Sequence, residues 1–182
     1  MQNSVPRLPR PFPVPHTDPE GRLTPELASV VAGARRRALR DGDRQIDTAH
    51  LLHSLLEADP EARAALGSVS RVARVRGYLA QRSIGYGLRW RGAVEDSGAV
   101  PVVRLPLPRT AGGGAWSPSA VGAVDGALAR AARRGAGRAA GVDLLAALVA
   151  DPGCRAVEVL RRAGVDPEPL GDRAGGGVPD LL

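Results

Sequence analysis

The chain has 182 residues, 43% of them hydrophobic but only 3% aromatic, so a single self-supporting core would be built from Ala, Val and Leu, which favours packed helices over a β-sandwich. All 25 basic residues are arginine, which excludes a P-loop lysine, a Schiff-base lysine and a Ser-Lys dyad. The net charge of +6 is compatible with acidic or nucleic-acid partners but identifies neither.

Residues 1–22 are rich in proline, with prolines at positions 6, 9, 11, 13 and 15. Proline at this density favours extended backbone and prevents a helix, so a flexible tail is predicted. The segment lacks the continuous apolar stretch of a signal peptide, and no run of 18 apolar residues follows anywhere. We expect a cytoplasmic protein with no membrane segment.

The first helix is predicted to begin at Pro25. Thr24 supplies a capping hydroxyl, proline suits the first helical position, and Glu26 places a negative charge in the first turn. Apolar residues then recur on one face until Asp41-Gly42 ends the helix.

Three further helices are predicted in the next forty or so residues. Asp47 or Thr48 can cap the second, whose leucines recur in pairs until Asp59-Pro60. A short third helix runs over 62–66 and ends at Gly67, and a fourth covers roughly 69–79.

The same pattern returns later in the chain. Trp116-Ser117-Pro118 repeats Leu23-Thr24-Pro25 at an offset of 93 residues (118 − 25). A mid-helix glycine, a terminal glycine and a leucine pair match in the same register: Gly33 with Gly126, Gly42 with Gly135, and Leu51-Leu52 with Leu144-Leu145. We interpret this as an internal duplication.

The duplication divides the chain into a tail over 1–22, a helical domain over 23–170 and a second flexible tail over 171–182. Within the domain, repeat 1 covers 23–82, an insertion covers 83–114, and repeat 2 covers 115–170. The insertion contains closely spaced prolines, which argue against a central strand, and three consecutive glycines.

The duplicated four-helix pattern resembles the Clp N-terminal (Clp repeat) domain of ClpA-, ClpB- and ClpC-type AAA+ unfoldases. In that family each repeat opens with an aromatic residue and Thr, and continues through a Gly-Thr-Glu-His-Leu-Leu-like stretch. The counterparts here are Leu23-Thr24-Pro25 with 47–52, and Trp116-Ser117-Pro118 with 140–145. The resemblance implies an all-α bundle of eight helices with pseudo-twofold symmetry that binds adaptors, unfolded segments or peptide-like ligands.

In ClpC-like members the resemblance also implies two phosphoarginine pockets near the opening threonines and the glutamates of the Thr-Glu-His stretch. Thr24 and Ser117 keep the hydroxyl, whereas Ala49 and Val142 replace the glutamates. A methyl or isopropyl group cannot make charge-assisted hydrogen bonds to a guanidinium, which argues against that ligand. No GxxxxGK[ST] motif of an ATPase motor occurs.

No catalytic, cofactor-binding or metal-binding set is predicted. His50 stands near a helix start and is interpreted as a packed or capping residue, and Cys154 as a small apolar residue without a disulfide partner or zinc-site spacing. No serine lies in a GxSxG elbow. The chain is therefore predicted not to be an enzyme.

The sequence thus predicts a monomeric, non-catalytic binding module whose partner is a Clp adaptor, an unfoldase or a peptide-like ligand. We expect the contacts at the repeat openings, on Leu23, Thr24, Trp116 and Ser117, because their pseudo-twofold equivalence favours a shared groove. The alternative is a nucleic-acid-binding protein that uses arginine-rich faces such as Arg35-Arg36-Arg37.

Overall fold

A computed structural model describes residues 19–84, 94–96 and 115–174. Within these residues the chain forms eight α-helices, a short 3-10 helix at Pro19–Arg22 and two strands of two residues each. The predicted all-α class is confirmed. Most of the two predicted tails (1–22 and 171–182), namely 1–18 and 175–182, and most of the predicted insertion lie outside the described residues.

Repeat 1 contains α1 (Pro25–Asp41), α2 (Thr48–Ala58), α3 (Pro60–Ala65) and α4 (Val69–Ser83). The Thr24 hydroxyl accepts a hydrogen bond from Leu27 N at 3.2 Å, and Gly42 ends α1 in the left-handed conformation at φ 69°. Helix α4 continues past its last buried apolar residue, Leu79. The extra turn is held by polar contacts, because Ser83 donates to the Asp41 carboxylate at 2.8 Å.

Repeat 2 contains α5 (Pro118–Arg133), α6 (Gly141–Val149), α7 (Arg155–Arg162) and α8 (Glu168–Ala174). Ser117 caps α5 as Thr24 caps α1, and Gly135 has the same φ of 69° as Gly42. The described structure extends beyond the predicted 23–170 domain on both sides, with the 3-10 helix before it and the last turn of α8 after it.

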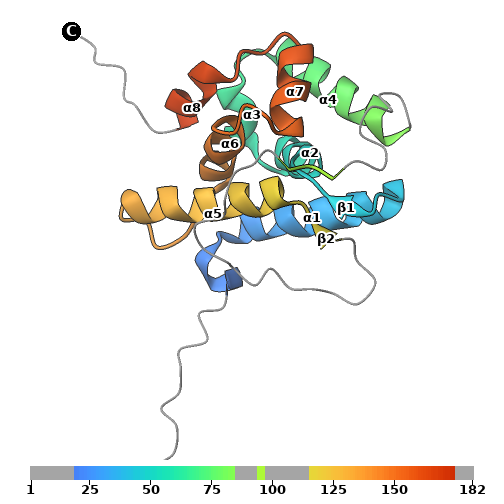
Figure 1. The fold of residues 1–182 in the computed structure, drawn as a ribbon. Coiled ribbons are helices and arrows are strands. Elements are labelled where there is room, and N and C mark those ends of the chain that lie inside the picture. Colours follow the sequence, from blue (N-terminus) through green and yellow to red (C-terminus); the bar gives the residue numbers. More distant parts are fainter. Residues whose placement is uncertain (1–18, 85–93, 97–114, 175–182) are drawn as a thin grey trace, which may run out of the picture.

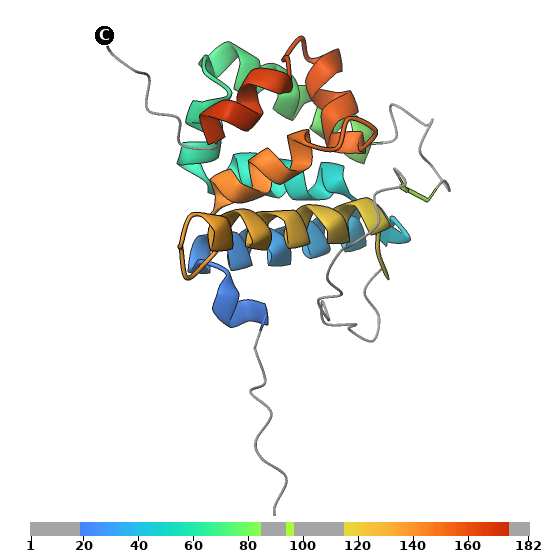
Figure 2. The ribbon, with the colours of Figure 1, turned by 60° about the vertical axis from the view of Figure 1, so that its left-hand side comes forward.

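The helices lie in three layers, which Figures 1 and 2 show from two directions. Helices α1 and α5 form one outer layer, α2 and α6 the middle layer, and α3, α4, α7 and α8 the other outer layer. Helices α1 and α5 run in opposite directions, since the residues before each one pair with the residues after the other: Leu23 with Ala139, and Trp116 with Ile46.

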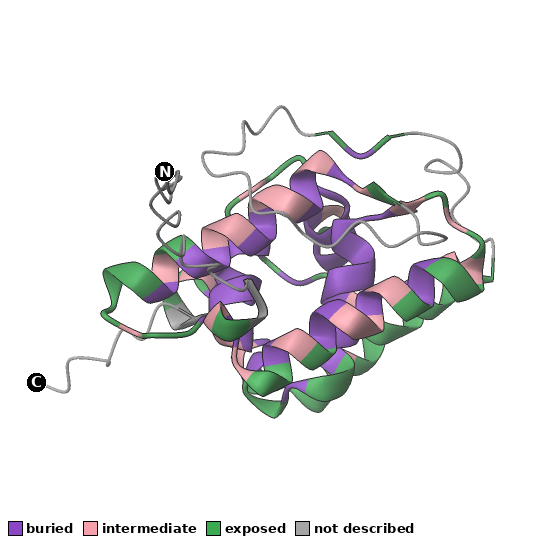
Figure 3. Ribbon diagram, turned by 90° about the horizontal axis from the view of Figure 1, so that it is seen from below, coloured by how far each residue is buried: buried purple, intermediate pink, exposed green. Residues whose placement is uncertain are grey.

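The two repeats interlock instead of packing as separate bundles. Helix α3 of repeat 1 packs on α6 and α8, and α7 of repeat 2 packs on α2 and α4. The buried leucines, valines and alanines of both repeats form one continuous core. Figure 3, viewed from the side of α1 and α5, shows the buried positions on the inward faces and the exposed ones outside. Because both repeats share this core, neither repeat can bury its apolar surface by itself.

The matched glycines Gly33 and Gly126 lie at equivalent helix crossings. A Cβ added at Gly33 would lie 3.0 Å from Ser54 Oγ on α2, and one at Gly126 would lie 3.1 Å from Ala147 Cβ on α6. The absence of a side chain therefore lets α1 approach α2 and α5 approach α6 closely. This equivalence confirms in space the duplication expected from the sequence.

Candidate functional site

The residues that open each repeat pair with backbone residues of the other repeat. At one crossing, strand β2 (Ala115–Trp116) pairs in parallel with β1 (Gln45–Ile46), and Ser117 N donates to Ile46 O at 2.9 Å. At the other, Leu23 bridges to Ala139, and Thr24 N donates to Ala139 O at 2.9 Å. These are called the Ser117 crossing and the Thr24 crossing below. They lie at opposite ends of the α1 and α5 pair.

The Ser117 crossing holds a buried carboxylate from outside both repeats. Glu95 is only 4% exposed and comes from the predicted insertion. Its oxygens accept hydrogen bonds from Thr48 N at 2.9 Å, Ser117 Oγ at 2.7 Å and Arg155 N at 2.7 Å, and from the Thr48 hydroxyl. We call this group of four donors the Glu95 seat.

The donors of the seat are explained by their places in the helices. Thr48 and Arg155 are the first residues of α2 and α7, where backbone N–H groups have no partner within the helix. Both helix N-termini carry partial positive charge, which stabilises an anion between them. Gln45 also contacts Glu95, since its Oε1 accepts the Glu95 backbone N–H at 2.9 Å.

A buried charged network lies beside the seat. Asp47, fully buried, caps α2 by accepting His50 N at 3.0 Å, and its carboxylate also contacts Arg82 and, at 2.7 Å, Arg155. Burial would raise the pKa of Asp47, but hydrogen bonds and charges from His50, Arg82 and Arg155 hold it below its usual range. The network joins α2, α4 and α7.

His50 uses both ring nitrogens within this network. Its Nδ1 lies 2.8 Å from Asp47 Oδ1 and 3.1 Å from Asp47 N, and its Nε2 lies 3.1 Å from Asp43 Oδ2. Burial alone would lower the pKa of His50, but its hydrogen bonds to the two carboxylates raise it. The interpretation of His50 as a capping residue agrees with this geometry, and of the two candidate caps for α2 the structure uses Asp47.

The Thr24 crossing places a different carboxylate in the corresponding position. Asp59 caps α3 by accepting Glu61 N and Ala62 N at 2.8 and 3.0 Å, and its other oxygen lies against the start of α6. A Cβ at Gly141 would lie only 1.8 Å from Asp59 Oδ2, so no side chain fits there. Asp59 thus stands between α3 and α6 as Glu95 stands between α7 and α2.

The sequence explains why repeat 2 needs an outside carboxylate. Its residue before α7 is Cys154, which makes no side-chain cap, where repeat 1 has Asp59. Glu95 was not among the residues predicted from the sequence. The available signal was that Glu95 and Asp96 are the acidic residues of a stretch, 84–114, that is otherwise basic or uncharged.

The four residues predicted to contact a partner are not brought together. Leu23 and Thr24 lie at one crossing, and Trp116 and Ser117 at the other. Leu23 and Ser117 are buried, whereas Thr24 and Trp116 are partly exposed. Arg35 of α1 lies over the Trp116 ring, 5.8 Å from its centroid. The four residues therefore lie at two separate crossings and do not line one shared groove.

The positions that replace the family glutamates also differ from each other. Ala49 is fully buried within α2, and Val142 is partly exposed on α6. Neither provides a hydrogen-bond acceptor on its side chain.

The described residues contain no cluster of His, Cys, Asp or Glu suited to a metal ion. Cys154 is buried, its Sγ donates to Leu148 O at 3.3 Å, and burial raises the pKa of its thiol to about 11. A thiol with this pKa carries almost no thiolate at neutral pH and is a poor nucleophile. No helix in the described parts of the chain is both long and apolar enough to cross a membrane.

The three consecutive arginines of α1 point in different directions. Arg37 is buried and contacts the Glu57 carboxylate and, at 3.3 Å, His53 Nδ1, whereas Arg35 contacts Trp116 and Arg36 is exposed. Burial and the charge of Arg37 lower the pKa of His53 to about 4. The triplet therefore does not form a single basic face.

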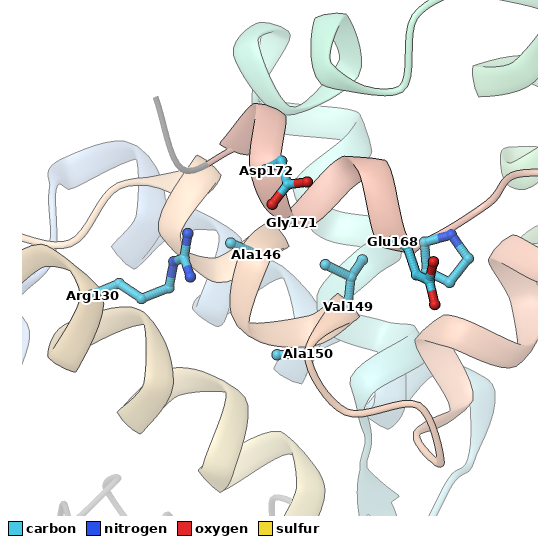
Figure 4. Close-up of a pocket in the computed structure, with 8 residues that line it drawn as sticks. Arg130, Ala146, Val149, Ala150, Glu168, Gly171 and Asp172 are labelled. Atoms are coloured by element: carbon cyan, nitrogen blue, oxygen red, sulfur yellow. The ribbon is translucent and has the colours of Figure 1, made fainter. Parts of the chain in front are cut away.

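A shallow groove of about 490 Å³ lies between α5, α6 and α8 (Figure 4). Arg130 stands on one wall, Glu168 and Asp172 stand on the α8 wall, and Ala146 and Val149 of α6 lie between them. None of the four residues predicted to contact a partner lines it.

Comparisons with solved structures agree on the fold. The N-terminal domain of the Clp-protease-associated chaperone ClpD from Arabidopsis thaliana matches with a TM-score of 0.59 and 21% identity, over 84% of this chain and 92% of that one. The Hsp104 N-terminal domain from Candida albicans matches with a TM-score of 0.59 and 13% identity, over 84% and 88%. A structure from a study of a malarial protein secretion system matches with a TM-score of 0.60 and 14% identity, over 85% and 92%.

No protein-family model matches the chain, and no curated protein matches its sequence. The fold is that of a Clp N-terminal domain, as the resemblance in the sequence predicted.

Proposed function

From this Clp N-terminal domain fold, we propose that the chain is a non-catalytic protein- or peptide-binding module of the Clp proteolysis system in the cytoplasm. It would act as an accessory factor, bind an adaptor, or sequester a peptide-like ligand. The observation that supports this most is the interlocked double repeat, whose likeness to the N-terminal domains of ClpD and Hsp104 extends over most of this chain.

The side chains with catalytic potential support a binding role. Both nitrogens of His50 lie against carboxylates, and the Cys154 thiol is buried with a raised pKa. Ser117 is buried, and its hydroxyl caps α5 by accepting Ala120 N at 3.0 Å while it donates to the Glu95 carboxylate at 2.7 Å. The structure assigns each of these groups a stabilising contact.

We place the partner contacts at the two repeat openings, on Leu23, Thr24, Trp116 and Ser117. The partly exposed Thr24 and Trp116 would touch the partner, while the buried Leu23 and Ser117 would hold the openings against the other repeat. Trp116 and Arg35 together offer an aromatic ring and a guanidinium, two groups that are enriched at the energetic centres of interfaces.

The test is co-purification from the source cell with identification of bound proteins and peptides by mass spectrometry. The tagged chain is expected to recover a Clp unfoldase, an adaptor or a defined peptide ligand, and Trp116→Ala is expected to recover less of it. Tyr78→Ala is the matched control, since Tyr78 is an exposed aromatic residue on α4 and belongs to neither opening. Circular dichroism would establish that both variants are folded. Recovery of no Clp component or peptide under repeated conditions would count against the proposal.

A second candidate is nucleic-acid binding, which is favoured by the exposed arginines on the outer layer. Helix α4 exposes Arg71, Arg74 and Arg76, and α7 exposes Arg161 beside it. Phosphate contacts would require log K to fall steeply and linearly with log salt concentration. A flat salt profile, or no binding of DNA or RNA at low salt, would eliminate this candidate.

A further inference from the structure

The Glu95 seat has the composition of a ligand site. Its four donors belong to the two repeats, on the first residues of α2 and α7 and on the residue that caps α5, whereas the carboxylate comes from the segment between the repeats. Thr48 is tied to α7 in its own right, because its Oγ1 accepts Ala156 N at 3.0 Å. The donors are therefore held in place by contacts that do not depend on Glu95.

The seat recognises more than a negative charge. Four hydrogen bonds saturate both carboxylate oxygens, and Gln45 accepts the backbone N–H of the same residue at 2.9 Å. A free inorganic anion could accept the four hydrogen bonds, but it has no backbone N–H to donate to Gln45. The contacts correspond to a glutamate within a peptide chain.

An equivalent carboxylate lies at the Thr24 crossing of this chain, between the starts of α3 and α6. Asp59 supplies it there from within its own repeat, next to Gly141. Repeat 2 has Cys154 in place of that aspartate, so without Glu95 the first N–H groups of α7 and α2 would be buried without an acceptor.

We propose that the Glu95 seat is a glutamate-binding site of the double-repeat body, that Glu95 is its intramolecular ligand, and that a glutamate of another peptide can occupy it when Glu95 is removed. A glutamate in a separate peptide could accept the same four hydrogen bonds with its carboxylate and donate its backbone N–H to Gln45. The site would exist whether or not the domain binds a Clp component.

The first test removes the internal ligand and adds one back. Glu95→Ala is expected to lower Tm by roughly 5 °C or more, because several buried donors lose their acceptor. Propionate, or an acetylated and amidated peptide of residues 93–97, should then raise Tm of the variant in a saturable manner. The peptide should bind the variant at least about tenfold more tightly than the wild-type chain, whose seat is filled.

Two matched controls accompany this test. The same peptide with Gln in place of Glu should not raise Tm, nor should sodium chloride at equal ionic strength. The variant Asp96→Ala removes the neighbouring exposed carboxylate and should show no response to propionate or to the peptide. Equal responses of the Glu95→Ala and Asp96→Ala variants, or of the Glu and Gln peptides, would overturn the proposal.

A second measurement covers the case in which Glu95→Ala does not fold. A double-mutant cycle of Glu95→Gln with Ser117→Ala, each followed by urea unfolding, separates the contact between the two side chains from the role of Ser117 as the α5 cap. The proposal requires the two substitutions to be coupled. Additive effects within experimental error would show that the seat does not act as a unit and would contradict it.

Discussion

His50 and Asp143 occupy equivalent positions in the two repeats, each at the third residue of its helix, and each contacts the backbone N–H of the residue that precedes the helix. Asp47 N lies 3.1 Å from His50 Nδ1 in α2, and Ala140 N donates to Asp143 Oδ2 at 2.9 Å in α6. The duplication has kept the capping geometry while exchanging a base for an acid. The partners have changed accordingly: His50 lies between two aspartates, whereas one nitrogen of Arg134, Nη2, donates to both carboxylate oxygens of Asp143 at 2.7 and 2.6 Å.

Asp143→Ala is expected to lower the free energy of unfolding by about 2 kcal/mol, since it leaves Ala140 N without an acceptor and Arg134 without its carboxylate. The cost is moderated because the Arg134 side chain is 45% exposed and can be solvated. Urea unfolding measures the change. Asp172→Ala, an exposed carboxylate on α8, is the control and should fall within about 0.5 kcal/mol of the wild type.

The two described histidines should make opposite contributions to the pH dependence of stability. The raised pKa of His50 means that the folded protein binds its proton more tightly, so this contribution is full below the unfolded value of 6.5 and is lost as pH rises through the folded pKa. The pKa of His53 is lowered to about 4, so its contribution is full above 6.5 and is lost between 6.5 and 4.

Single and double variants separate the contributions of the two histidines to stability. The stability difference between His53→Gln and the double variant His50→Gln/His53→Gln should shrink as pH rises above 6.5. The difference between His50→Gln and the same double variant should shrink as pH falls from 6.5 to 4. Chemical unfolding at a series of pH values measures both, and a difference that stays constant over either range would contradict the corresponding assignment.

Asp125 on α5 is expected to destabilise the protein at neutral pH. Both of its carboxylate oxygens are buried and have no hydrogen-bond partner among the described residues, and burial raises its pKa to about 6. Because the residue is partly exposed, Asp125→Asn should increase the stability at pH 7 by only about 1 kcal/mol. The gain should disappear below the unfolded pKa of 3.8, where both states are protonated. A gain that persists at pH 3 would show that charge is not its cause.

Gly126 and Gly122 lie one turn apart on α5. Adding a side chain should lower the stability of the protein at Gly126 and raise it at Gly122. Gly126→Val should cost about 1–3 kcal/mol, since even a Cβ would approach Ala147 Cβ to 3.1 Å. Gly122→Ala should stabilise by about 0.5–1 kcal/mol, because no atom of the described residues lies within 4 Å of an added Cβ and alanine favours the helix. Thermal unfolding of both variants is the measurement. Similar effects would mean that α5 and α6 are not in close contact at Gly126.

Much of the fold could be predicted from local signals. The capping hydroxyls of Thr24 and Ser117, the prolines after them and the left-handed Gly42 and Gly135 mark the helix ends, since these depend on a few neighbouring residues. The 93-residue repeat predicted two equivalent halves, and the solved structures agree with the fold. The end of α4 was harder to locate, because its last turn is held by the distant Asp41 and Asp43 and not by an apolar stripe.

The sequence by itself determined the helices, their caps and their duplication, because backbone hydrogen bonding and apolar periodicity are local properties. Only the tertiary structure decided how the halves interlock, that the openings lie at two separate crossings, and that Glu95 stands between α2 and α7. The physical reason is the need to satisfy buried helix N-termini. Which acceptor meets the first N–H groups of α2 and α7 depends on packing between residues 47 and 60 positions apart in the chain, a relation that no local pattern encodes.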